Sequence, residues 1–76
     1  MNIVLYTLPH CSKCHMLKMY LNSLNIKYEE RNAQDFVPYL TSHGFSTTPI
    51  LELNGQLFDF VSISYVLQLL EEKGLY

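Results

Sequence analysis

The sequence predicts a single domain of the α/β class, with its elements in the order βαβαββα. Short apolar runs rich in β-branched and aromatic residues alternate with segments whose leucines recur at helical spacing. Only a few residues join the first strand, helix and second strand, which favours a parallel pair with a helical crossover. Further along, Asn54-Gly55 separates two more apolar runs, and this dipeptide is the strongest short signal for a β-hairpin.

The first half of the chain supplies three of these elements. Ile3–Thr7 is a short apolar run that ends before Pro9, and it reads as a buried strand. Residues 11–25 are predicted to form a helix, and residues 26–31 alternate imperfectly, as a second strand would. The apolar stripe of this helix consists of Cys14, Leu17, Leu21 and Leu24.

The second half supplies the remaining helices and the hairpin. Asp35 is the predicted N-cap of a helix that tolerates Pro38 in its first turn and stops at Gly44. Residues 49–53 and 56–60 are the hairpin strands, and Ser62 caps a final helix that ends at Gly74. The apolar face predicted for this last helix is Ile63, Val66, Leu67 and Leu70.

Composition narrows the class of protein. The 76 residues leave room for one small domain but none for a separate substrate-binding lobe. Apolar residues make up 49% and charged residues 16%, which is typical of a globular chain, and a net charge of −2 without a basic cluster argues against nucleic-acid partners. No apolar run approaches the roughly 18 residues of a membrane span, and the first residues lack a basic leader. We therefore expect a cytoplasmic monomer that does not bind membranes.

Both cysteines of the chain lie in Cys11-Ser12-Lys13-Cys14, where the first strand gives way to the first helix. If Cys11 is the first helical residue, its sulfur faces unpaired backbone N–H groups, which favour thiolate over thiol. Cys14 lies one turn later and points back toward the same sulfur. Lys13 and a protonated His10 would add positive charge, so Ser12, Lys13 and His10 are the residues expected to tune the thiol pKa or the reduction potential.

Two other interpretations of the cysteine pair stay open. A zinc site needs two more ligands, which His10, His15 and His43 could supply in principle, although the first two are direct neighbours of the cysteines and diverge from them. The thiols could also be idle in a module that only binds a partner, with Phe58 and Phe60 as its apolar contacts. A purely structural disulfide is disfavoured, because so short a loop stabilises by only about 2 kcal/mol. The residues favour redox chemistry.

Taken in order, these motifs resemble the glutaredoxin family over essentially the whole chain, residues 1–76. The resemblance rests on Cys-x-x-Cys at the first helix, Thr47-Thr48-Pro49 before the third strand, and the Asn54-Gly55 hairpin. It implies a thioredoxin-like fold with a four-stranded mixed sheet and helices on both faces. Residues 6–11, with Cys14, His15 and Lys18, are also similar to the glutaredoxin-like hydrogen donors of ribonucleotide reductase, which thioredoxin reductase recharges.

The resemblance also implies a reaction and its site residues. Cys11 would attack a substrate disulfide, and Cys14 would then resolve the mixed disulfide. Pro49 would follow a cis peptide bond, so that the backbone of Thr48 pairs with an extended substrate beside Cys11. The N–H groups after Ser62 could hold a substrate carboxylate. The protein would be an enzyme with no bound cofactor. It would take electrons from NADPH through thioredoxin reductase, or from glutathione. Its substrate would be a disulfide-containing protein such as ribonucleotide reductase.

The chain departs from the glutathione-using members of the family at three places. Those members usually carry Lys where this chain has Leu8, a Gly-Gly pair near Asp59-Phe60, and an Asp where this chain reads residues 61–63. The changes remove a cation, add an anion and block close approach to the backbone, so we expect weak glutathione binding. Ser12 also stands where the family usually has Pro. Chains with Ser at this position resemble members that share an iron-sulfur cluster between two subunits, so a glutathione-dependent iron-sulfur carrier is a further alternative.

Overall fold

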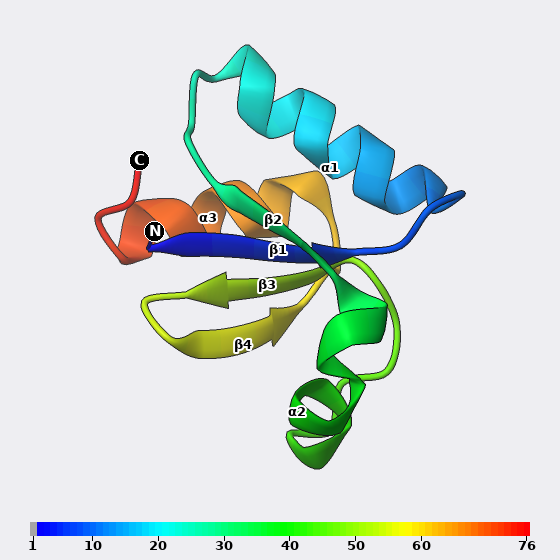
Figure 1. Cartoon of the computed structure of the whole chain (residues 1–76). Coiled ribbons are helices and arrows are strands. Elements are labelled where there is room, and N and C mark those ends of the chain that lie inside the picture. The colour runs from blue at the N-terminus through cyan, green and yellow to red at the C-terminus, as the bar shows by residue number, and fades with distance from the viewer. Residues whose placement is uncertain (1) are drawn as a thin grey trace.

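The computed structural model describes residues 2–76 and contains a four-stranded mixed sheet with three α-helices (Figure 1). The predicted order βαβαββα is confirmed. The elements are β1 (Ile3–Thr7), α1 (Ser12–Ser23), β2 (Glu29–Asn32), a 3₁₀ helix (Ala33–Phe36), α2 (Val37–Ser42), β3 (Ile50–Leu53), β4 (Gln56–Asp59) and α3 (Ile63–Glu72). None of the helices within residues 2–76 is long and apolar enough to cross a membrane.

The strands lie in the order β2-β1-β3-β4. β1 pairs in parallel with β2 and antiparallel with β3, and β3 pairs antiparallel with β4. All five residues of β1 are buried, because this strand is central and its two faces are both covered. This position explains why the first strand reads as a continuous apolar run rather than an alternating one.

Alternate residues of β1 belong to two separate cores. Ile3 and Leu5 join the larger core, with side chains from α1 and α3, whereas Val4 and Tyr6 join the smaller core with Leu40 of α2. Helices therefore cover both faces of the sheet, as the thioredoxin-like fold requires. The larger core consists of Ile3, Leu5, Leu17, Leu21, Ile26, Leu51, Leu53, Val66, Leu69 and Leu70.

A buried phenol ties the smaller core to the sheet. Tyr6 is fully buried, and its hydroxyl donates to Glu52 at 3.0 Å and accepts from Arg31 Nη1 at 3.2 Å. Tyr39 of α2 donates to the same Glu52 oxygen at 2.8 Å. The ring of Tyr6 also packs edge-on against Phe36, with centroids 5.3 Å apart. These bonds connect β1, β2 and β3 to the segment that carries α2.

The boundaries of α1 and β2 differ from the prediction. Cys11 is the N-cap of α1 rather than its first helical residue, and the helix ends at Ser23. Asn25 adopts a left-handed backbone with φ 58°, and the N–H of Ile26 closes on the carbonyl of Leu21 at 3.0 Å, which is a helix-terminating Schellman geometry. The buried Ile26 then fills the larger core, so β2 starts three residues later than expected.

Two other details of the prediction are wrong. Asp35 is not the cap of α2, whose N-cap is Phe36 without a side-chain capping bond; the 3₁₀ helix before α2 is capped by Asn32, whose Oδ1 accepts the Gln34 N–H at 2.9 Å. In α3, Leu69 is buried and Leu67 only partly buried. These two leucines flank the stripe of Val66 and Leu70 on opposite sides, so helical spacing alone could not choose between them.

Three predictions from local residues in the second half of the chain are confirmed: the hairpin turn, the cap of the last helix and the place of Pro38. Asn54 and Gly55 both have positive φ, 52° and 86°, as a two-residue type I′ hairpin turn requires. Ser62 caps α3 by accepting the Tyr65 N–H at 3.1 Å, and Pro38 lies in the first turn of α2.

Candidate active site

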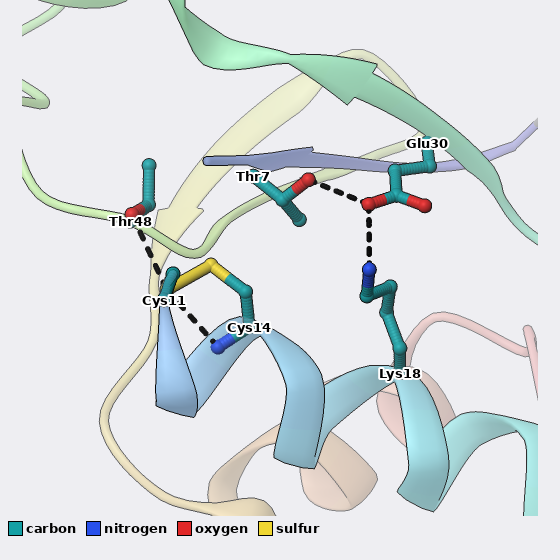
Figure 2. Close-up of polar contacts among 6 residues, drawn as sticks. All are labelled: Thr7, Cys11, Cys14, Lys18, Glu30 and Thr48. Atoms are coloured by element: carbon teal, nitrogen blue, oxygen red, sulfur yellow. Dashed lines mark hydrogen bonds and ion pairs between the residues drawn. A yellow bond between two sulfur atoms is a disulfide. The ribbon is translucent and has the colours of Figure 1, made fainter. Parts of the chain in front are cut away.

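The loop between β1 and α1 places both cysteines at one end of the sheet. His10 has a positive φ of 63°, which turns the chain so that Cys11 follows with an extended backbone and caps α1. Cys11 and Cys14 form a disulfide with their Cα atoms 5.2 Å apart (Figure 2). The left-handed turn at His10 has no clear sequence signal, because a non-glycine residue seldom adopts it.

Two donors point at the sulfur of Cys11. The backbone N–H of Cys14 donates at 3.1 Å and the Thr48 hydroxyl donates at 3.5 Å. The sulfur thus takes the place of the oxygen in an ordinary side-chain N-cap. Donors in this position favour a negatively charged sulfur over a neutral one once the disulfide is reduced. Cys11 thus contacts the helix end through a capping bond, as the N-cap, rather than from the first helical position.

The two cysteines differ in exposure. Cys11 is half-buried, whereas the Cys14 side chain is only 2% exposed and belongs to the buried face of α1. Of the two cysteines that line the cleft, Cys11 is therefore the more exposed residue. Burial also disfavours charge on Cys14.

The cis peptide bond at Thr48-Pro49 is confirmed. Pro49 is fully buried, and it leads directly into β3, which begins at Ile50. Thr48 is half-buried, and Figure 2 shows its side chain beside Cys11. Residues far apart in the sequence are thus brought together as the resemblance implied.

A polar cluster that the sequence did not reveal lies next to the disulfide. Thr7 donates to Glu30 Oε2 at 2.7 Å, and Lys18 binds the same oxygen at 2.8 Å. Figure 2 shows the side chains of this cluster, of which Thr7 is buried. The hydrogen bonds from Lys18 and Thr7 hold the pKa of Glu30 below its usual range. Lys18 also lines the open cleft around the two cysteines, one helical turn after Cys14.

The residues predicted to tune the thiols are at the surface. Ser12, Lys13 and His10 are exposed, and among the described residues none of their side chains forms a hydrogen bond with either sulfur. The hydroxyl of Ser62 is engaged at the start of α3 by the Tyr65 N–H. Within residues 2–76, no three His, Cys, Asp or Glu side chains are grouped so as to hold a metal ion.

The residues that depart from glutathione-using relatives have structural partners. Leu8 is half-buried against the smaller core, and Phe60 is half-buried against the larger core. Phe58 packs on the larger core, and Lys73 Nζ lies 4.9 Å from the centre of its ring. Asp59 is exposed at the end of β4. The two phenylalanines therefore pack within the fold, on the hairpin and the chain that follows it.

Comparisons with known proteins agree with this geometry. Residues 3–58 match the family model for glutaredoxin. Among solved structures, the chain is similar to a crystal structure of a mutant of the thioredoxin-like protein BC3987, with 26% sequence identity and a TM-score of 0.78. The match covers 92% of this chain and 95% of that chain. A search of curated proteins found no match.

Proposed function

The chain belongs to the glutaredoxin family, and we propose that it reduces disulfides in proteins or small molecules through Cys11 and Cys14. The observation that carries this proposal is the asymmetry of the pair. Cys11 is half-buried and its sulfur accepts two hydrogen bonds, while Cys14 is buried. A nucleophile needs the first arrangement, and a resolving thiol needs only to reach that nucleophile.

In the first step, the Cys11 thiolate attacks one sulfur of the substrate disulfide. A sulfur–sulfur bond forms between Cys11 and the substrate, and the other substrate sulfur leaves as a thiolate that takes up a proton. The Cys14 N–H and the Thr48 hydroxyl stabilise the attacking charge.

In the second step, Cys14 loses its proton and attacks the sulfur of Cys11. The disulfide of the protein forms, and the remaining substrate sulfur leaves and is protonated. The substrate disulfide has then gained two electrons and two protons, and the protein dithiol has lost them. The product is the bonded pair shown in Figure 2.

We propose that thioredoxin reductase and NADPH return the pair to the dithiol more readily than glutathione does. Leu8 supplies no cation for a glutathione carboxylate, and Asp59 adds an exposed negative charge. A disulfide-containing protein, such as ribonucleotide reductase, would be the substrate. We place the reaction in the cytoplasm, where reducing systems keep thiols reduced.

The test compares two recharging systems in parallel, using a small disulfide such as 2-hydroxyethyl disulfide as substrate. We expect faster NADPH consumption with thioredoxin reductase than with glutathione and glutathione reductase. The Cys11→Ser variant is the control, and with it the rate of NADPH consumption should equal the rate measured without the protein. The opposite ranking would overturn the proposed reductant, whereas inactivity in both systems, with zinc bound after purification, would favour the binding-module alternative.

A further inference from the structure

The cleft that contains the disulfide has a lysine in its wall. It measures about 570 Å³, and Cys11, Cys14 and Lys18 all line it. Among the described residues that line this cleft, Lys18 is the only Asp, Glu, Lys or Arg. Lys13 is exposed in the same stretch of α1 but does not line the cleft. An unpaired ammonium group at Lys18 would attract anions toward the reacting sulfur.

The charge of Lys18 is paired with that of Glu30 on β2. Lys18 Nζ lies 2.8 Å from Glu30 Oε2, and the buried Thr7 donates to the same oxygen at 2.7 Å. Two donors on one oxygen, from β1 and from α1, hold the carboxylate in place. An opposite charge this close cancels most of the field that Lys18 alone would produce at a distance.

The pair lies at the boundary of two neighbouring clefts. Thr7, Lys18 and Glu30 line a second cleft of about 470 Å³, and this cleft shares Leu8 and Pro9 with the one that contains the disulfide. Lys18 therefore faces both spaces, while Glu30 lines only the second. The lysine and glutamate side chains are 30% and 41% exposed, so solvent and salt moderate the charge effect without abolishing it.

We propose that Glu30 determines how the active-site cleft responds to substrate charge, because it neutralises Lys18. With the pair intact, anionic disulfides gain no attraction from this wall, and cationic disulfides meet no repulsion. This inference rests on the proposed function, because it concerns disulfides that react at Cys11. It also adds a reason for poor use of glutathione, which is an anion, beyond the missing cation at Leu8.

The experiment compares three small disulfides of the same length that differ in charge. They are neutral 2-hydroxyethyl disulfide, anionic 3,3′-dithiodipropionate and cationic cystamine. The reduced protein is mixed with each at pH 8, where free histidine is mostly uncharged. The protein dithiol and one small disulfide give the protein disulfide and two small thiols, so no other reductant is needed. The rate constant is obtained by quenching with iodoacetamide and measuring the mass of the protein.

Glu30→Gln leaves the charge of Lys18 uncompensated. Each rate constant is divided by that of the unmodified protein with the same disulfide, which cancels the intrinsic reactivity of the reagent. Relative to the neutral disulfide, we expect this variant to react about threefold faster with the anionic one and about threefold slower with the cationic one. Both changes should shrink toward one in 0.5 M salt, because screening weakens them.

The matched control is Glu29→Gln. It removes the same charge from the adjacent residue, whose carboxylate pairs with Arg31 and which lines neither cleft. We expect all three disulfides to keep their relative rates in this variant. A loss of net charge alone would affect both glutamine variants equally.

Two more variants test the pairing itself. Lys18→Gln leaves Glu30 uncompensated, so the preference should reverse, with the anionic disulfide about threefold slower and the cationic one about threefold faster. The double variant, Lys18→Gln with Glu30→Gln, removes both charges and should restore the relative rates of the unmodified protein. Damage to the fold cannot produce opposite preferences in the single variants and recovery in the double one.

The possible results separate this inference from the proposed function. Equal factors for the three disulfides in Glu30→Gln, the same preference in Glu29→Gln, or no recovery in the double variant would overturn the role of Glu30 and leave the dithiol chemistry intact. Failure of the unmodified protein to reduce any of the three disulfides would overturn the proposed function itself.

Discussion

The hydrogen bond from Thr48 to Cys11 offers a quantitative test of how the nucleophile is activated. Thr48→Val keeps the size of the side chain but removes the hydroxyl that donates at 3.5 Å. Hydrogen bonds to charged groups contribute about 1.5–3 kcal/mol, and a long bond between two half-buried residues should contribute about 1 kcal/mol. Because 1.36 kcal/mol corresponds to tenfold, the thiolate-to-thiol ratio of Cys11 should fall about fivefold.

The assay is the rate of alkylation of Cys11 by iodoacetamide as a function of pH, in a Cys14→Ser background that leaves one thiol. At pH values where thiol predominates, Thr48→Val should react about fivefold more slowly than its parent. At high pH, where both proteins are fully ionised, the two rates should converge. The control is Thr47→Val, because Thr47 is the exposed neighbour of Thr48 and forms no hydrogen bond with either sulfur among the described residues.

Two results would refute this reasoning. Identical rates at low pH would mean that the hydroxyl does not stabilise the thiolate. A fivefold reduction at every pH would mean that the substitution blocks access to the sulfur rather than changing its charge.

The remaining predictions concern the resolving cysteine and the tyrosine cluster. Cys14→Ser should accumulate a mixed disulfide between Cys11 and the substrate, detected by mass spectrometry, and trapping on Cys14 in Cys11→Ser instead would reverse the assigned roles. The hydrogen bond to Glu52 raises the pKa of Tyr39 to about 12 from its ordinary value of 10.0. Because the pKa of Tyr39 is higher in the folded than in the unfolded state, this group contributes its full stabilisation below pH 10. That contribution is lost as the pH rises from 10 toward about 12. Urea unfolding should therefore show a shallower loss of stability over this range in Tyr39→Phe than in the unmodified protein, and parallel losses would contradict the assignment.

The elements that the sequence predicted correctly have strong local signals. The run Ile3–Thr7, the Asn54-Gly55 turn and the Ser62 cap each depend on residues within a few positions of one another. The position of the dithiol at the start of α1 could also be predicted from neighbouring residues, because it follows from the order of strand, turn and helix. Pro49 is different, since its cis bond was implied by the family resemblance rather than by local residues.

The features that were missed depend on contacts between distant segments. β2 begins late because Ile26 is used to fill the larger core, and Leu69 rather than Leu67 is buried because of how α3 lies against the sheet. The cluster of Thr7, Lys18 and Glu30 joins three separate elements, so no spacing in the sequence could reveal it. Periodicity identifies a face of a helix, but packing decides which flank of that face is buried.

The placing of the strands has a consequence for self-association. The two outer strands, β2 and β4, have only four residues each, and β2 carries Glu29, Glu30 and Arg31. Short, charged edges resist the addition of a foreign strand, which is the first step of edge-to-edge aggregation. The long apolar strand is kept at the centre, where both of its sides are already paired. The outer strands of the sheet therefore offer an added strand only short edges with charged residues to pair with.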